Sequence, residues 1–257
     1  MGRFDGFLIC TDFDGTYSYD SSHVSKENAE AVEYFKSEGG LFTVASGRNP
    51  NFLSCYKDIL GANAPVMCLN GGILASPDTF KPLETFHLPL GIQIPLSDFI
   101  LSHEGVDSLE IFYGDCECIW WNRKDGVSPL QIFSAAPPPY YNIVLIQSRA
   151  YTVDYMHELR RLHSDILRFD SSWPEGIEVQ GTDGGKGNAL KRIKRLCPRP
   201  VTKIIAVGDY ENDISMLTKA DLGIAVGNAL DSVKKAADIV TVKNTDHAIA
   251  RIINHIL

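Results

Sequence analysis

The sequence predicts an α/β fold, a doubly wound parallel-sheet (Rossmann-like) core that is interrupted by an inserted α+β domain. Strand-like and helix-like segments alternate in the first and last thirds of the 257 residues. The middle third instead holds successive strand-like runs and is richer in proline and aromatic residues. Glycines and carboxylates follow several of the predicted strands, which is where open parallel sheets bind ligands.

The first third follows a β-α-β-α-β pattern. Three short apolar runs end in turn residues, which is typical of buried parallel strands; they are Phe7–Thr11, Leu41–Ala45 and Val66–Leu69. Between them we expect helices over Lys26–Glu38 and around Asn51–Leu60. Ser25 can cap the first of these helices, and Gly39-Gly40 would end it.

The last third repeats the alternation, so both ends of the chain are predicted to contribute to one sheet. Helices are expected over Lys186–Leu196, Asn212–Lys219, Leu230–Ala237 and His247–Leu257. Strands are expected at Ile204–Val207, Leu222–Ala225 and Ile239–Val242.

The middle third predicts a separate α+β insert. Its strand-like runs Leu109–Tyr113 and Cys118–Trp121 have no obvious helix between them, and Tyr151–Ser164 is its clear long helix. Pro82 and a glycine-rich stretch that begins at Gly181 are natural boundaries. We therefore assign residues 1–82 and 182–257 to the core, and residues 83–181 to the insert.

Bulk composition excludes several classes of partner. The formal net charge of −8 disfavours binding to nucleic acids or anionic membranes. No run of about 18 apolar residues is present, and the N-terminal apolar stretch is too short for a signal peptide. The six cysteines show no convincing metal-ligand spacing and fit reduced thiols. We expect a cytoplasmic protein with neither nucleic acid nor membrane as partner.

Residues with catalytic and ligand-binding chemistry gather at the predicted carboxyl ends of the strands. In chain order these residues are Asp12, Asp14, Ser46, Gly47, Arg48, Asn70, Asp209, Asn212 and Asp213. Lys186 adds a positive charge at the start of a helix, directly after a glycine-rich turn. Since the strands are parallel, these ends meet at one edge of the sheet.

A magnesium site with room for a phosphate follows from these residue types. Carboxylates from separate segments repel one another unless a cation neutralises them, and an all-oxygen set suits Mg²⁺. Asp12, Asp14 and Asp209 would supply these oxygens. Lys186 would add a point charge for the phosphate, and Ser46 a hydroxyl donor.

Substrate contacts are predicted for four further residues: Gly47, Arg48, Asn70 and Asn212. The backbone N–H near Gly47 could help to cradle phosphate oxygens. Arg48 could contact the substrate or merely pair with an acidic neighbour. Asn70 precedes two glycines and could instead belong to a simple turn.

Four segments of the sequence resemble, in order, the motifs of the haloacid dehalogenase superfamily. They are Asp12-Phe13-Asp14-Gly15-Thr16, Ser46-Gly47-Arg48, Lys186 within Gly-Gly-Lys-Gly-Asn-Ala-Leu, and Gly208-Asp209-Tyr210-Glu211-Asn212-Asp213. The resemblance covers the whole predicted core, and the insert is similar to the α/β cap of the Cof-type branch. One departure is Tyr17, because an apolar residue usually follows the threonine of the first motif.

The resemblance implies a catalytic role for each of four residues. Asp12 attacks phosphorus and becomes an aspartyl phosphate, while Asp14 protonates the leaving alcohol and then activates water. Ser46 and Lys186 hold the transferring phosphoryl group.

The resemblance also implies the metal ligands. Mg²⁺ would be bound by the carboxylates of Asp12 and Asp209 and by the backbone carbonyl of Asp14. Asp213 and Asn212 would support this site. Asp209 and Asp213 are four positions apart and would share one face if that turn is helical.

The function expected on these grounds is magnesium-dependent hydrolysis of a small phosphomonoester, with a sugar phosphate as the favoured substrate class. Asp14 favours phosphatases and phosphomutases, since dehalogenases of the superfamily lack this aspartate and its ion-pumping ATPases carry threonine there. A phosphomutase and a non-catalytic module that binds a phosphorylated metabolite are the alternatives. The natural substrate and the oligomeric state stay open.

In the insert, Trp120, Trp121 and Arg123 are candidates for a substrate pocket, because aromatic and arginine side chains suit ring recognition. Neighbouring residues of a strand point to opposite faces, so at most one of the two tryptophans can face the site. Core packing is the alternative for the other.

Overall fold

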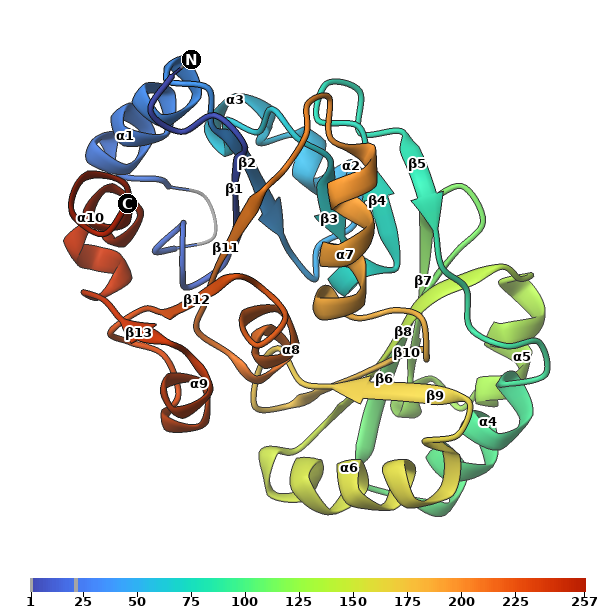
Figure 1. The fold of residues 1–257 in the computed structure, drawn as a ribbon. Helices are drawn as coiled ribbons and strands as arrows, with labels where there is room; N and C mark the ends of the chain where they lie inside the picture. Colours follow the sequence, from blue (N-terminus) through green and yellow to red (C-terminus); the bar gives the residue numbers. More distant parts are fainter. Residues whose placement is uncertain (1, 21–22) are drawn as a thin grey trace. The chain divides into compact units, whose positions relative to one another are not determined.

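A computed structural model describes residues 2–20 and 23–257 of the chain, which divide into two compact units (Figure 1). The first unit, called the core, comprises the described residues up to Glu84 together with Lys186–Leu257. The second unit, called the insert, is Thr85–Gly185. Among the helices of the described residues, none is long and apolar enough to cross a membrane.

The core contains an eight-stranded sheet with the order β13-β12-β11-β1-β2-β3-β4-β5. The strands are β1 (Phe7–Asp12), β2 (Leu41–Ala45), β3 (Val66–Cys68), β4 (Ile73–Ala75), β5 (Pro82–Thr85), β11 (Lys203–Gly208), β12 (Leu222–Ala225) and β13 (Ile239–Val240). Central strand β1 runs parallel to both β2 and β11, and Ile9 lies opposite Phe42 and Ile205. The first and last thirds of the sequence thus meet at the centre of one sheet, as predicted.

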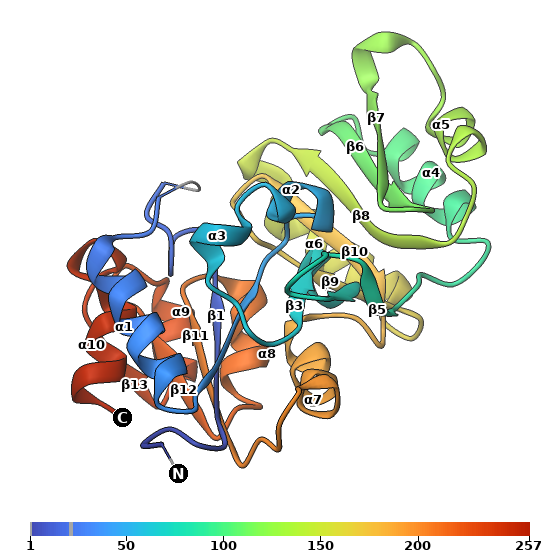
Figure 2. The same cartoon turned by 90° about the horizontal axis from the view of Figure 1, so that it is seen from above.

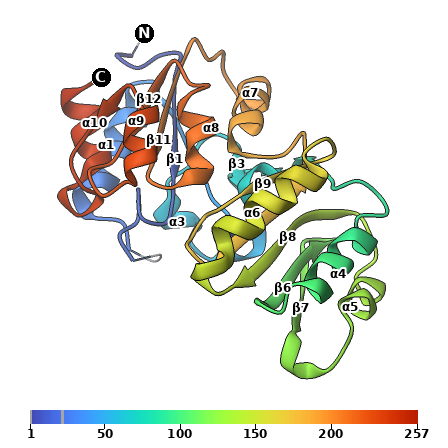
Figure 3. The ribbon, with the colours of Figure 1, turned by 90° about the horizontal axis from the view of Figure 1, so that it is seen from below.

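Helices cover both faces of this sheet. They are α1 (Lys26–Ser37), α2 (Pro50–Ser54), α3 (Lys57–Leu60), α7 (Lys186–Leu196), α8 (Ile214–Leu217), α9 (Asp231–Ala236) and α10 (Ala248–His255). The connections β1-α1-β2 and β11-α8-β12 run in opposite directions along the sheet, so right-handed crossovers place α1 and α8 on opposite faces. Helix α10 packs beside α1, and α7 packs beside α8 (Figure 3). The doubly wound architecture is therefore confirmed.

Two predicted core helices are broken in the structure. The segment around Asn51–Leu60 forms α2 and α3, which are separated at Cys55 and Tyr56. The segment Asn212–Lys219 starts one residue earlier as a 3₁₀ turn, η3 (Glu211–Asp213), before α8. The carboxylate of Asp213 accepts hydrogen bonds from two backbone N–H groups of the preceding loop, which fixes this tight turn.

The insert contains a five-stranded antiparallel sheet with the order β7-β6-β8-β10-β9 (Figure 2). Its strands are β6 (Val106–Tyr113), β7 (Glu117–Asn122), β8 (Tyr140–Gln147), β9 (Leu167–Asp170) and β10 (Gly176–Gly181). Its helices are α4 (Gln93–Ser102), α5 (Pro129–Ala135) and α6 (Arg149–His163). Apolar side chains from these helices and from alternate strand positions form one hydrophobic cluster. The α+β character predicted for this segment is confirmed.

Helix α4 is an element that the sequence pattern did not reveal. Its sequence, QIPLSDFILS, lacks a clear polar face and carries Pro95 at the third helical position. Proline is tolerated in the first turn, where its missing N–H would have no helical partner. The helix forms because Leu96, Phe99 and Ile100 are buried in the hydrophobic cluster of the insert.

The two neighbouring tryptophans of the insert, Trp120 and Trp121, differ in burial. Trp121 is buried and donates its indole N–H to the carbonyl of Val127 at 2.6 Å, whereas Trp120 is 59% exposed. Arg123 donates to three backbone carbonyls: those of Val106, Ile100 and His103. Arg123 thus ties α4 to the start of β6, which gives its guanidinium a structural role.

Candidate active site

The first aspartate of the site stands at the carboxyl end of the central strand. Asp12 is the last residue of β1, and the loop that follows returns with a hydrogen bond from the Gly15 N–H to the Ser18 carbonyl at 2.9 Å. Gly15 has φ 83°, and a Cβ there would lie 2.7 Å from an oxygen of Asp209. Glycine therefore allows this loop to bend closely over the end of β11.

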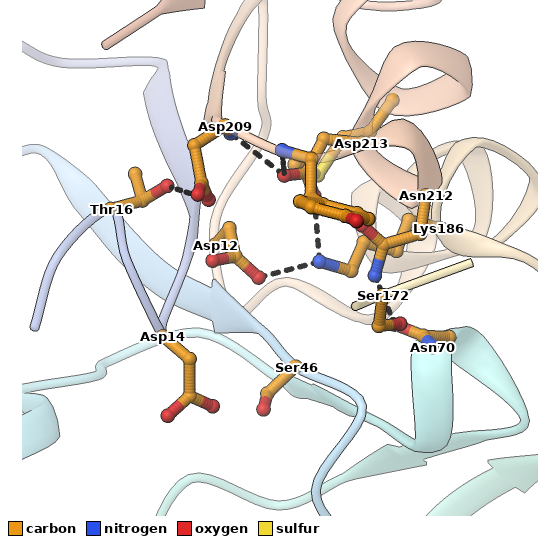
Figure 4. Close-up of polar contacts among 12 residues, drawn as sticks. Asp12, Asp14, Thr16, Ser46, Asn70, Ser172, Lys186, Asp209, Asn212 and Asp213 are labelled. Atoms are coloured by element: carbon orange, nitrogen blue, oxygen red, sulfur yellow. Dashed lines mark hydrogen bonds and ion pairs between the residues drawn. The ribbon is translucent and has the colours of Figure 1, made fainter. Parts of the chain in front are cut away.

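Lys186 joins two carboxylates in the centre of the site (Figure 4). Its ammonium donates to Oδ1 of Asp12 and to Oδ1 of Asp213, both at 2.6 Å. The lysine side chain is fully buried. Burial acts to lower the pKa of Lys186, but the two neighbouring carboxylates outweigh it and raise the pKa overall. Lys186 therefore stays charged in the site.

Three carboxylates gather around this lysine. Oxygens of Asp12, Asp209 and Asp213 all lie within 4.8 Å of one another. Burial, with repulsion from the other two carboxylates, raises the pKa of Asp12 well above its usual range despite Lys186. Burial and the nearby Asp213 likewise raise the pKa of Asp209 to about 6. The single lysine does not offset this concentration of negative charge, so the cluster favours a further cation.

The three carboxylates differ in how many oxygens remain available. Asp213 uses both: Oδ1 accepts from Lys186, and Oδ2 accepts from the backbone N–H groups of Asp209 and Tyr210 at 2.9 and 3.1 Å. Asp209 accepts from the Thr16 hydroxyl through Oδ1 at 2.7 Å, and Asp12 uses its Oδ1 for Lys186. The contacts with Thr16 and Lys186 leave Oδ2 of Asp209 and Oδ2 of Asp12 as the better placed pair for a cation.

The second aspartate of the first motif is turned toward a different partner. Oδ2 of Asp14 accepts a hydrogen bond from Nε of Arg48 at 3.3 Å, and the carboxylate is not part of the three-carboxylate cluster. The structure thus shows the acidic-neighbour pairing that was one of the two alternatives for Arg48. Ser46 is buried, and its hydroxyl accepts the Arg48 N–H at 3.1 Å across Gly47.

The two predicted asparagines contact each other. Oδ1 of Asn70 accepts from Nδ2 of Asn212 at 3.0 Å, and both side chains are buried. Asn70 has φ 50° within η1 (Leu69–Gly71), a left-handed conformation that asparagine tolerates better than most residues. The amide pair links the end of β3 to the loop after β11 and brings both predicted substrate contacts to the same edge of the sheet.

Sequence reasoning missed one member of the site and left one position open. The first motif gives the Thr16 side chain no role, yet its hydroxyl orients Asp209; its place two residues after Asp14 is the available signal. Tyr17, the departure from the family pattern, is buried with its ring 5.2 Å from that of Phe42. Tyrosine therefore fills the apolar position of the pattern.

We expect the Lys186→Met variant to unfold much more easily than the native protein in metal-free buffer. Methionine would leave two buried carboxylates without their cation, and breaking such a pair costs about 3–5 kcal/mol. Urea denaturation in the presence of a chelator measures the free energy of unfolding. The matched control is Lys26→Met, which removes an exposed ion pair with Glu30 and should cost under about 1 kcal/mol. Equal losses in both variants would show that Lys186 is not needed to neutralise the cluster.

Comparison with known proteins agrees with this geometry. The family model of the haloacid dehalogenase-like hydrolases matches residues 9–253. "Phosphatase YwpJ" of Bacillus subtilis is 26% identical, and the alignment covers 97% of this chain and 99% of that protein. "5-amino-6-(5-phospho-D-ribitylamino)uracil phosphatase YitU" of the same species is also 26% identical, with 95% of each chain covered.

The fold also matches a solved structure. A haloacid dehalogenase-like hydrolase from B. subtilis superposes with a TM-score of 0.81 at 24% identity, covering 97% of this chain and 99% of that one. The match of fold, the near-complete family match and the curated phosphatase relatives agree with the order of the four motifs along the chain. This chain therefore belongs to the haloacid dehalogenase-like hydrolase family and is a phosphatase of its Cof-type branch.

Proposed function

We propose that this phosphatase hydrolyses the phosphate monoester of a small metabolite through a covalent phosphate on Asp12, with Mg²⁺ as its cofactor. The observation that carries the proposal is the Asp12 carboxylate at the end of β1, which Lys186 holds through one oxygen at 2.6 Å. This contact fixes the orientation of the Asp12 carboxylate, which can then attack phosphorus. A buried, oriented carboxylate beside a fixed positive charge suits attack on a phosphate dianion.

The reaction divides into two displacements at phosphorus. In the first, a bond forms between an Asp12 oxygen and phosphorus while the bond to the leaving alcohol oxygen breaks, and Asp14 gives its proton to that oxygen. In the second, Asp14 takes a proton from water, which attacks phosphorus and releases inorganic phosphate and free Asp12. Lys186 and the hydroxyl of Ser46 would hold the transferring oxygens through both steps.

The residues of the site fit a magnesium ion. Its all-oxygen donor set is the chemistry that Mg²⁺ prefers, and the raised pKa values of Asp12 and Asp209 reflect an excess of negative charge. Asp12 and Asp209 would hold the ion with the backbone carbonyl of Asp14. Asp213, whose two oxygens are already bonded, would act by orienting Lys186 and the Asp209 loop. When bound, the ion would neutralise charge on the transferring phosphoryl group.

A small phosphorylated alcohol, with a sugar phosphate as the leading candidate, is the proposed substrate class. The relative YitU is named for a substrate whose phosphate is attached to a ribityl chain, which is a polyol. Residues 83–181 are proposed to supply the contacts that select among such alcohols, with Gly47, Asn70 and Asn212 nearer the phosphate and Arg48 beside Asp14. A phosphomutase would return the phosphoryl group to its product, and a pure binding module would release none.

We expect inorganic phosphate to accumulate from a panel of sugar and polyol phosphates with Mg²⁺, and to fall to background with a chelator. Ca²⁺ should restore the rate poorly, because it takes more ligands at longer distances and disturbs the in-line geometry. A phosphate-release assay gives the result directly. Isomerised phosphate ester without free phosphate would indicate the mutase, and full activity in the chelator or with Ca²⁺ would contradict the Mg²⁺ assignment.

Mg²⁺ binding at this site can also be tested without turnover, through the thermal stability of the protein. Since burial raises the pKa of Asp209 from 3.8 to about 6, the metal-free fold retains a proton that the unfolded chain has released across that interval. Its stability therefore falls as pH rises through the interval, and Mg²⁺ removes the repulsion that causes the fall. Thermal unfolding should show a larger Mg²⁺-induced rise in Tm at about pH 7 than at about pH 5. Equal rises would place the metal away from Asp209.

A further inference from the structure

We propose that Arg48 is a positioning residue for Asp14, and that it fixes which oxygen of Asp14 exchanges a proton with the substrate. This inference rests on the acid–base role proposed for Asp14. The two oxygens of this carboxylate have different surroundings. Oδ2 accepts from Nε of Arg48 at 3.3 Å, whereas Oδ1 is buried and bonded by none of the described residues.

Arg48 is itself held from several sides. Its backbone N–H donates to the Ser46 hydroxyl at 3.1 Å, and its carbonyl accepts from the N–H of Leu69 at 3.0 Å. These bonds attach the residue to the end of β3 as well as to β2. Its guanidinium lies over the ring of Phe52, 4.6 Å from the centroid. A planar cation on an aromatic face has fewer orientations open to it than a free surface arginine.

The supporting aromatic residues lead back to the same catalytic loop. The ring of Phe52 lies 5.0 Å from that of Tyr56, which lies 6.4 Å from the buried ring of Phe13. Phe13 directly precedes Asp14 in the chain. Contacts thus run from Asp14 through Arg48 and the aromatic rings to Phe13, which is bonded to Asp14 in the chain.

Local sequence explains why Phe52 is placed to receive the guanidinium. Asn49 caps α2 by accepting the N–H of Phe52 at 2.8 Å, and Pro50 fills the first helical position, where its fixed φ suits the turn. Phe52, three residues after the cap, is therefore held close to Arg48. The short helix that sequence patterns merged into a longer one is the element that supports the arginine.

The contact with Arg48 distinguishes the two oxygens of Asp14. Oδ2 already accepts an arginine N–H, so Oδ1 is the oxygen left to face the substrate. A buried oxygen without a hydrogen-bond partner is unfavourable, and this cost is relieved when a partner arrives. The leaving oxygen of the substrate, and later the attacking water, are the partners that the proposed reaction supplies to Oδ1.

The strength of the ion pair is not the basis of this role. The side chains of Arg48 and Asp14 are 43% and 33% exposed, and exposed ion pairs of this kind contribute little to stability. Loss of Arg48 should therefore leave the fold almost unchanged while the carboxylate turns more freely. The consequence should be seen only in steps that need the proton of Asp14.

The experiment compares kcat/KM of native protein, Arg48→Met and Arg48→Lys for phosphate esters whose leaving groups range from nitrophenol to a simple alcohol. Nitrophenolate leaves without a proton, so its kcat/KM should change less than about 3-fold, whereas the alkyl ester should lose about 10-fold or more. Arg48→Lys keeps the charge but not the planar donor and should resemble Arg48→Met. Arg195→Met, which removes an exposed pair with Glu84, is the matched control and should change neither.

A double-mutant cycle with Asp14→Asn separates the possible outcomes. If Arg48 acts through Asp14, adding Arg48→Met to Asp14→Asn should cause no further loss on the alkyl ester. Equal losses for every ester, or a full further loss in the Asp14→Asn background, would show that Arg48 binds the phosphate directly and would overturn the inference. If Asp14→Asn itself leaves the dependence on the leaving group unchanged, the proposed acid–base role fails instead, and the positioning role fails with it.

Discussion

The Asp12→Asn variant should lose phosphatase activity by roughly 10⁴-fold or more, because the amide cannot form the bond to phosphorus. No burst of product should appear with nitrophenyl phosphate, and no phosphate should become attached to the protein. Rapid mixing at high enzyme concentration, followed by acid quench and mass measurement of the intact chain, tests both. Native protein quenched in the same way should carry one phosphate group.

The folding of this variant provides the control. Burial raises the pKa of Asp12, so the ionised carboxylate is costly to bury in the metal-free protein. A neutral asparagine of the same size should therefore not lower Tm in metal-free buffer, and it can still accept the Lys186 hydrogen bond. Loss of activity without loss of stability would separate catalysis from folding. Native-like turnover by the variant would mean that water, rather than Asp12, attacks phosphorus.

The Asp14→Asn variant should divide substrates by the basicity of their leaving groups. General acid–base catalysis contributes about 10²–10⁴-fold, so kcat/KM for an alkyl phosphate should fall by that factor. Nitrophenolate needs no proton to leave, and the variant should release about one equivalent of it rapidly. Turnover should then stall, because hydrolysis of the phosphate on Asp12 still lacks its base.

Stopped-flow absorbance on nitrophenyl phosphate measures the burst. Steady-state phosphate release from an alkyl ester measures the fall in kcat/KM. The matched comparison is Asp12→Asn, which should show no burst with either ester. Native rates on both esters would reduce Asp14 to a structural or metal-binding residue. Equal losses on both would show that Asp14 acts before the leaving group departs, in binding rather than in proton transfer.

Much of the core could be predicted from short patterns because they depend on local chemistry. β2, α7 and β12 have the predicted bounds, since a buried parallel strand or an amphipathic helix shows its periodicity within a few residues. Helix α4 was missed because its apolar side chains give no clear period, and its burial depends on strands far away in the chain. The segment 51–60 is predicted as one helix because nothing in its periodicity marks the break at Cys55 and Tyr56.

The sequence by itself determined the residue types of the candidate site and the edge of the sheet at which they gather. Parallel strands align their carboxyl ends, so Asp12, Ser46 and Asp209 had to approach one another once the strands were identified. The same property brought Asn70 and Asn212 to that edge. Such inferences need only strand direction and order, both of which follow from the alternation of elements along the chain.

Only the tertiary structure decided which atoms pair. Lys186 contacts Asp12 across 174 positions of sequence, Asp213 has both oxygens engaged, and Arg48 donates to Asp14 rather than standing free. Each pairing depends on rotamers and on backbone placement within a fraction of an ångström, because hydrogen bonds weaken steeply with distance and angle. Residue spacing along a sequence does not carry that information; the packing of separate segments does.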